Sequence, residues 1–233
     1  MTATPAPTTE AAAPLAGPIV PRSLTHALLH DATHVLCARD ADLARVVERF
    51  GTPPLWARRP GFASLVRIIL EQQVSLSSAR ATFERVRTAL GEVSPRTVRA
   101  AGPPGLRAQG FTRQKADYCA NLAELVDTGR LDLGAVARAP VDEGRARLMA
   151  VRGLGPWSVD IYFLMALRRP DIWPHGDLAL ADAMRRVKGL PGRPDAETQA
   201  RIASLWAPWR AVGARILWHY YLSAPRVREG HAT

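Results

Sequence analysis

Apolar side chains recur every three or four residues along most of the chain from Ser23 onward, and this is the spacing of one face of an α-helix. Alternation with a period of two, which would indicate strands, is not convincing anywhere. We therefore predict an all-α fold of about ten helices. The segments with helical spacing are 23–40, 40–51, 62–73, 76–91, 112–128, 142–150, 178–187, 195–206 and 208–223, with a short helix opening at 95 and another helix opening at 156.

Residues that cap or interrupt helices set the boundaries between these segments. Asp40 is a suitable N-cap for the second helix, and Gly51 is a suitable stop. Ser75 and Ser94 precede two further helical segments in the same way. The segment Gly51–Gly61 contains three prolines and is therefore predicted to be a loop.

The stretch Leu148–Asp177 contains a tight turn, bounded by Gly153 and Gly155, between two apolar helical segments. Glycine permits the positive φ that a tight turn needs, and its missing Cβ lets a ligand approach the main chain. Pro156 stands at the first position of the following helix, where the first-turn N–H groups are free to bind a phosphate oxygen. The chain then reaches Asp177 at the start of another helical segment. The stretch therefore predicts a helix-hairpin-helix that supplies an anion-binding turn and a single carboxylate.

The charge of the chain points to a polyanionic partner. Its 233 residues carry a formal net charge of +10 and a pI near 10.8, which favours nucleic acid. A plainer alternative is a GC-rich genome that favours Arg and Ala, since Lys115 and Lys188 are the only lysines. A hydrophobic content of 47% is enough to bury a substantial core.

The termini and the cysteines narrow the class of protein further. Residues 1–22 are rich in Ala, Pro and Thr and predict a disordered tail; residues 23–224 form the helical domain, and 225–233 a flexible C-terminus. No apolar run approaches the length of a membrane span of about 18 residues. Cys37 and Cys119 have no CxxC partner, so we expect neither zinc nor a disulfide but core thiols of a cytosolic protein.

Several motifs in register resemble one known family. These are GLGPWS at 153–158 followed by WPHGD at 173–177, ILEQQVSLSSA at 69–79, GFTRQKA at 110–116 and LWAPWRAVGARILWHYY at 205–221. Together they resemble the helix-hairpin-helix, Gly/Pro-Asp superfamily of DNA glycosylases, and within it the alkylpurine (3-methyladenine) glycosylase II branch, from about Ala41 to Ser223. The resemblance implies a two-lobed helical fold with a DNA-binding cleft. It also implies a monomer that acts on double-stranded DNA containing damaged bases, in the cytoplasm at the nucleoid.

The resemblance assigns the catalytic carboxylate to Asp177. Cleavage of an N-glycosidic bond passes through an oxocarbenium-like transition state, which a carboxylate stabilises or supplies with an oriented water. The alternative is that Asp177 is only the N-cap of the helix over 178–187. Asp160, Asp171 and Asp182 are the nearby aspartates that are not expected to act.

The base pocket and the wedge are also implied by position in the family. Trp157 and Trp218 match pocket tryptophans, whose faces would attract an electron-poor alkylated purine. Ile161 and Tyr162 lie one turn beyond, with Ile161 where a close relative has a third aromatic. Gln73 matches the wedge that fills the space of a flipped base; the alternative is that Gln72 and Gln73 merely end a helix.

The hairpin itself is expected to bind DNA and, in the family, a monovalent cation. Its DNA-binding residues would be Arg152, Gly153, Leu154, Gly155, Pro156 and Ser158. The cation would be held by the backbone carbonyls of Met149, Val151 and Leu154. No other cofactor is expected, because two cysteines cannot hold the four-cysteine iron–sulfur cluster of some relatives.

The resemblance also predicts the type of reaction. Relatives that cut the strand form a Schiff base through a lysine just after the hairpin, and here that position is Trp157. We therefore expect a monofunctional hydrolase that initiates base excision repair. Two alternatives remain: a non-catalytic DNA-binding module, or a glycosylase for deaminated or oxidised bases.

Overall fold

The computed structural model describes residues 22–225, which form twelve α-helices and one five-residue π-helical segment, η1, without any strand in that range. The predicted all-α class is therefore confirmed. In chain order the elements are α1 (His26–Arg39), α2 (Ala41–Phe50), α3 (Phe62–Glu71), α4 (Leu76–Leu90), α5 (Pro95–Ala108), α6 (Arg113–Asp127), α7 (Leu133–Arg138), α8 (Val141–Met149), α9 (Pro156–Ile161), η1 (Tyr162–Ala166), α10 (Leu178–Val187), α11 (Ala196–Ser204) and α12 (Arg210–Ser223). Within residues 22–225 no helix is both long and apolar enough to cross a bilayer. The predicted tails lie outside the described residues, apart from Arg22 and Pro225.

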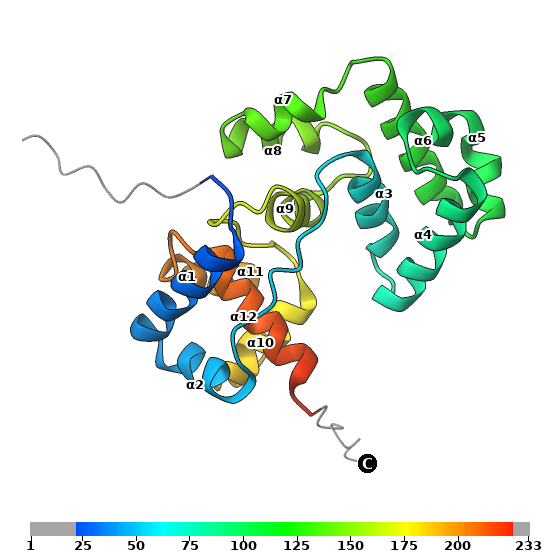
Figure 1. Cartoon of the computed structure of the whole chain (residues 1–233). Coiled ribbons are helices and arrows are strands. Elements are labelled where there is room, and N and C mark those ends of the chain that lie inside the picture. The colour runs from blue at the N-terminus through cyan, green and yellow to red at the C-terminus, as the bar shows by residue number, and fades with distance from the viewer. Residues whose placement is uncertain (1–21, 226–233) are drawn as a thin grey trace, which may run out of the picture.

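The helices gather in two groups (Figure 1). One group, which we call the terminal lobe, contains α1 and α2 from the beginning of the chain and α10, α11 and α12 from its end. The other, the central lobe, contains the consecutive helices α3 to α6. The α9–η1 segment packs against α3, and α8 packs against both α7 and α9. The residues of the helix-hairpin-helix therefore lie where the two groups meet.

Residues 51–61, predicted to be a loop, join α2 to α3 and cross from one lobe to the other (Figure 1). We call this segment the strap. Its backbone is fixed by hydrogen bonds to distant parts of the chain: the Arg58 N–H donates to the Met165 carbonyl at 2.9 Å, and the Leu55 carbonyl accepts from Arg215 Nε at 3.0 Å. The strap is thus held in place without regular structure of its own.

Arg215, on α12, is completely buried. Besides its bond to Leu55, it donates from Nη1 to the Ala211 carbonyl at 3.0 Å and from Nη2 to the Leu164 carbonyl at 2.8 Å. All three acceptors are neutral, and burial lowers the pKa of the guanidinium to about 9. One side chain therefore ties α12 to η1 and to the strap.

A second polar cluster closes the terminal lobe. Lys188 Nζ, just after α10, lies 2.6 Å from both Asp40 oxygens and 2.9 Å from Asp42 Oδ2. Trp206 Nε1 donates to Asp40 at 2.8 Å, and the ring is buried, as expected for a tryptophan that packs between helices. Burial alone would raise the pKa of Asp40, but the hydrogen bonds from Lys188 and Trp206 outweigh it and lower the pKa. Asp40 also caps α2, as predicted, by accepting from the Leu43 N–H.

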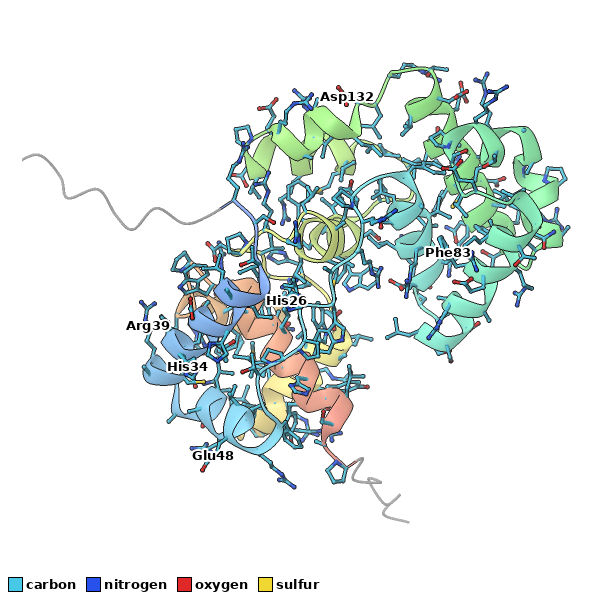
Figure 2. All side chains as sticks on the ribbon, viewed as in Figure 1. His26, His34, Arg39, Glu48, Phe83 and Asp132 are labelled. Carbon is cyan, nitrogen blue, oxygen red and sulfur yellow. The ribbon has the colours of Figure 1, made fainter. Side chains whose placement is uncertain are left out.

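The structure differs from the helix predictions in three places. The helix at Ser94 is not short: α5 has 14 residues, in two pieces joined at Gly102, where φ is 59°. Helix α7 was not predicted, because six residues show too little periodicity. Its N-cap is Asp132, labelled in Figure 2, whose side chain accepts from the Ala135 N–H at 2.9 Å. The helix that begins at Pro156 continues as the π-helical segment η1.

Both cysteines are free. Cys119 is completely buried, and this burial raises the pKa of its thiol strongly. Cys37 is only partly buried, so the description as a core thiol holds for Cys119 and in part for Cys37.

Candidate active site

Asp177 stands immediately before α10 and is held by three N–H donors. Its Oδ1 accepts from the Leu180 N–H at 2.9 Å, which makes it the N-cap, and from Trp218 Nε1 at 3.4 Å. Its Oδ2 accepts from Trp157 Nε1 at 3.0 Å. The N-cap interpretation is therefore correct, and it is compatible with a second role because the carboxylate has further lone pairs.

This arrangement stabilises a negative charge in a fixed orientation. Hydrogen bonds from N–H groups to an ionised carboxylate are stronger than hydrogen bonds between neutral groups. The dipole at the N-terminus of α10 also favours the negative charge. Asp177 is 9% exposed, while its neighbour Leu178 is 68% exposed, so the carboxylate lies just beneath the surface. A cationic centre that reached it would be stabilised in a largely desolvated place.

The two tryptophans predicted to line a base pocket are brought together at Asp177. Trp157 comes from α9 and is partly buried, and Trp218 comes from α12 and is 9% exposed. The sequence predicted a role for their ring faces, but the binding of both indole N–H groups to the carboxylate was not predicted. This contact could have been predicted from the general rule that the N–H group of a buried tryptophan needs a hydrogen-bond acceptor.

The other two predicted pocket residues are placed differently. Tyr162 is completely buried, and its hydroxyl accepts from the Gly61 N–H at 3.0 Å. Burial raises the pKa of this hydroxyl. Ile161 is 3% exposed within the hydrophobic core. Both side chains are thus part of the core where α3 and the strap cover α9–η1, and a contact between either of them and a base stays a prediction.

The nearby aspartates are engaged in ion pairs. Asp160 is completely buried between Arg145 and His175, whose Nδ1 lies 2.8 Å from Asp160 Oδ2. Elsewhere in the chain, Asp171 pairs with Arg210 at 2.7 Å and Asp182 pairs with Arg186 at 3.0 Å. Asp177 is instead held by neutral donors, which leaves its charge available to a ligand.

The hairpin between α8 and α9 contains two glycines with different structural requirements. Gly153 has φ of 93°, and a Cβ built there would lie 2.3 Å from Cγ of Tyr118. Gly155 has φ of −82°, and a Cβ there would meet nothing within 4 Å. Gly153 is therefore needed for packing inside the protein, whereas the space beside Gly155 is open to a ligand.

The remaining residues predicted to bind DNA at the hairpin also include both exposed and buried side chains. Arg152 is exposed and its guanidinium lies 5.8 Å from the ring centre of Tyr118, and Pro156 occupies the first position of α9 as predicted. Leu154 is 3% exposed, so only its backbone can meet a ligand. The Ser158 side chain is 2% exposed and its Oγ accepts from Gln72 Nε2 at 2.8 Å, so the buried hydroxyl does not favour a phosphate contact, and the contact predicted for Ser158 stays a prediction.

The turn between α3 and α4 is the other exposed feature of this region. Gln73 is exposed with φ of 57°, and Val74 and Leu76 beside it are 44% and 63% exposed. We call residues 73–76 the tip. Gln72 stands at the C-cap of α3, is partly buried and donates to the Gly153 carbonyl, whereas Gln73 is exposed.

The expected cation ligands are the carbonyls of Met149, Val151 and Leu154. The Val151 carbonyl already accepts from the Leu154 N–H at 3.0 Å, which leaves it one lone pair. Neutral carbonyl oxygens are the type of donor that a hard cation takes, and the cation on this turn stays a prediction.

A cavity of about 630 Å³ lies away from this site, at the other end of α10. Arg49, Arg185, Arg186 and Tyr220 line it. The three arginines stand in the last turns of α2 and α10, where the helix dipole favours a positive charge. The cavity does not include Asp177, and its arginines have a structural explanation.

The fold and the arrangement of hairpin and aspartate define a class of DNA repair protein. Residues 66–208 match the model of the family described as "HhH-GPD superfamily base excision DNA repair protein", and the chain belongs to this family. It is 27% identical over 203 residues to DNA-3-methyladenine glycosylase 1 of Schizosaccharomyces pombe, covering 84% of this chain and 87% of that protein. It is 27% identical over 186 residues to DNA-3-methyladenine glycosylase 2 of Escherichia coli, covering 73% of this chain and 63% of that protein.

A solved structure agrees. The 3-methyladenine DNA glycosylase of S. pombe in complex with abasic DNA superposes with a TM-score of 0.73 at 26% identity, covering 83% of this chain and 98% of that one. The family resemblance stated from the sequence is thus confirmed.

Proposed function

We propose that this protein is a monofunctional DNA glycosylase. It acts as a monomer on double-stranded DNA, hydrolyses the N-glycosidic bond of alkylated, 3-methyladenine-type bases and so initiates base excision repair. The observation that carries the proposal is the Asp177 carboxylate, fixed by Trp157, Trp218 and the Leu180 N–H beside the hairpin. The names of the relatives support the substrate class.

In this proposal the base leaves the helix before the reaction. Flipping costs a few kcal/mol and favours damaged or weakly paired bases. The tip, led by Gln73, enters the space that the base leaves. The hairpin binds backbone phosphate through its amides at Gly155 and beyond, assisted by Arg152. A monovalent cation on the hairpin carbonyls would add positive charge near that phosphate.

The chemical step follows from the position of Asp177. As the bond to the base breaks, positive charge develops on the sugar, and the fixed carboxylate stabilises it while water adds to the same carbon. The N–H edges of Trp157 and Trp218 are used on Asp177, so in this proposal the electron-poor base meets their ring faces.

The two lysines support a hydrolase without lyase activity. Lys115 Nζ donates to the carbonyls of Leu70 and Gln72 at 2.7 and 2.8 Å. Lys188 Nζ is paired with Asp40 and Asp42 in the terminal lobe. Each lysine already has a structural role, and Trp157 occupies the position where a Schiff-base lysine would stand.

The test is release of free base from methylated duplex DNA by the wild type, by Asp177→Asn and by Glu48→Gln. Glu48 is exposed at the edge of the terminal lobe (Figure 2) and serves as a matched loss of one negative charge. We expect release by the wild type and Glu48→Gln with intact strands, and at least a hundredfold slower release by Asp177→Asn. Equal release by all three would mean that another carboxylate acts.

Two further outcomes identify the alternatives. Tight DNA binding without release of any methylated base would favour the non-catalytic module or a lesion of another class, which a panel of deaminated and oxidised bases would separate. A covalent complex trapped with borohydride would contradict the monofunctional mechanism.

A further inference from the structure

Gln72 connects the end of α3 to the hairpin. Its Nε2 donates to the Gly153 carbonyl at 2.8 Å and to Ser158 Oγ at 2.8 Å. Both N–H bonds of the amide are therefore used on residues more than eighty positions away in the sequence. The next residue is Gln73, so this contact anchors the base of the tip directly on the hairpin.

Lys115, from α6, holds the same end of α3 from the other side. Its ammonium donates to the carbonyls of Leu70 and Gln72, which belong to the group that a helix end leaves without helical donors. Burial lowers the pKa of Lys115, so its placement has a desolvation cost that the two carbonyls and the negative end of α3 offset. The lysine thus fixes the last turn of α3 against α6.

Tyr118, one turn further along α6, completes the connection. Its ring lies so close to Gly153 that a Cβ there would come within 2.3 Å of Cγ, and the Arg152 guanidinium lies 5.8 Å from the ring centre. The end of α3, the first turns of α6 and the hairpin are therefore joined pairwise by Gln72, Lys115 and Tyr118.

We propose that Gln72, Lys115 and Tyr118 form a brace that fixes the tip relative to the hairpin, so that wedge insertion and phosphate binding occur as one rigid step. Gln72 is then a positioning residue for base flipping. The inference rests on the proposed glycosylase function. It gives the GFTRQKA motif, which contains Lys115, a structural role in holding the end of α3.

The brace has a consequence for substrate choice. A tip that is held in place can replace a stacked base without first being ordered, whereas a loose tip must lose conformational freedom on insertion. The brace therefore matters most for a lesion in a stable pair. It matters little for a lesion that is already unpaired, because flipping then needs little help from the tip.

The experiment compares Gln72→Met, which keeps the size of the side chain but removes both donors, with Gln109→Met as a matched control at the end of α5. Each protein is given the same methylated base either in a fully paired duplex or in single-stranded DNA, under single-turnover conditions. Gln72→Met is expected to be roughly tenfold slower on the duplex, as the loss of about two hydrogen bonds suggests, and less than twofold slower on the single strand. An equal loss on both substrates, or no loss on either, would overturn the proposal.

A second measurement does not depend on catalysis. Amide hydrogen exchange of the free protein should become faster in Gln72→Met over residues 73–76 and over 152–158, and should stay unchanged over the same residues in Gln109→Met. Unchanged exchange at the tip would refute the brace even in an active enzyme. If the wild type releases no base while exchange responds as expected, the proposed function fails and the brace stands.

Discussion

Substitutions of the two hairpin glycines should have separate effects, one on the stability of the fold and the other on DNA binding. Gly153→Ala places a Cβ at φ of 93° and 2.3 Å from Cγ of Tyr118. The left-handed backbone costs an L-residue about 1–2 kcal/mol, and overpacking costs about 1–3 kcal/mol. The sum, about 2–5 kcal/mol, corresponds to a fall in Tm of roughly 4–20 °C for a protein of this size.

Gly155→Ala is the matched change two residues away. Its backbone has φ of −82° and ψ of 177°, which any residue adopts, and no atom lies within 4 Å of the added Cβ. We expect a Tm within about 2 °C of the wild type, because exposed substitutions without strain change stability little. The methyl group would instead displace a phosphate from the α9 amides, weakening duplex binding by roughly tenfold to a hundredfold.

Thermal unfolding by circular dichroism and fluorescence anisotropy with an undamaged duplex measure the two effects. The reasoning fails if Gly155→Ala unfolds as early as Gly153→Ala, or if Gly155→Ala binds DNA as tightly as the wild type. A further check is Tyr118→Ser in the Gly153→Ala background, which should recover only part of the overpacking share, because the Tyr118 Cβ that serine keeps lies 2.8 Å from the added Cβ.

Three further predictions concern side chains that hold the site and the lobes. Trp157→Phe keeps an aromatic face but removes the N–H bound to Asp177, so single-turnover base release should slow by roughly tenfold or more while Tm changes little; an unchanged rate would show that the indole N–H does not support catalysis. Lys188 holds the pKa of Asp40 below 3.8 against the opposing effect of burial. The ionised carboxylate should therefore make the wild type more stable than Asp40→Asn by its full amount above pH 3.8, and this difference in unfolding free energy should shrink as the pH falls below 3.8. Urea titrations at a series of pH values would measure it. Arg215→Met leaves the carbonyls that it bound without donors, at about 1–3 kcal/mol each, and should lower the urea midpoint; a midpoint equal to the wild type would contradict the role given to this buried arginine.

Local patterns were enough to predict most helices and their starts. Asp40 and Ser75 cap α2 and α4 as expected, since capping depends on neighbours within three residues. Helix α7 was not predicted because six residues complete fewer than two turns. The full length of α5 was not predicted because Gly102 and the two prolines after it indicate the end of a helix rather than a kink.

The site could be predicted only in part for a related reason. Asp177 and Trp157 were found through motifs, but nothing local shows that their side chains meet. Gln72 and Tyr162 bind groups 81 and 101 residues away, and such bonds leave no periodic signal in the sequence. Tyr162 was expected at a pocket because helical spacing gives its direction relative to Trp157 but not which element covers that face.

The order of the helices along the chain also determines the order in which the two lobes can fold during synthesis. Helices α3 to α6 are consecutive, so the central lobe can fold from local contacts as it is synthesised. The terminal lobe cannot, because Arg210, where α12 begins, follows Phe50, where α2 ends, by 160 residues. At about 5–20 residues per second, α1 and α2 wait roughly 10–30 s for their partners. Since Trp218 on α12 also completes the surroundings of Asp177, the nascent chain acquires its complete candidate site only when α12 docks.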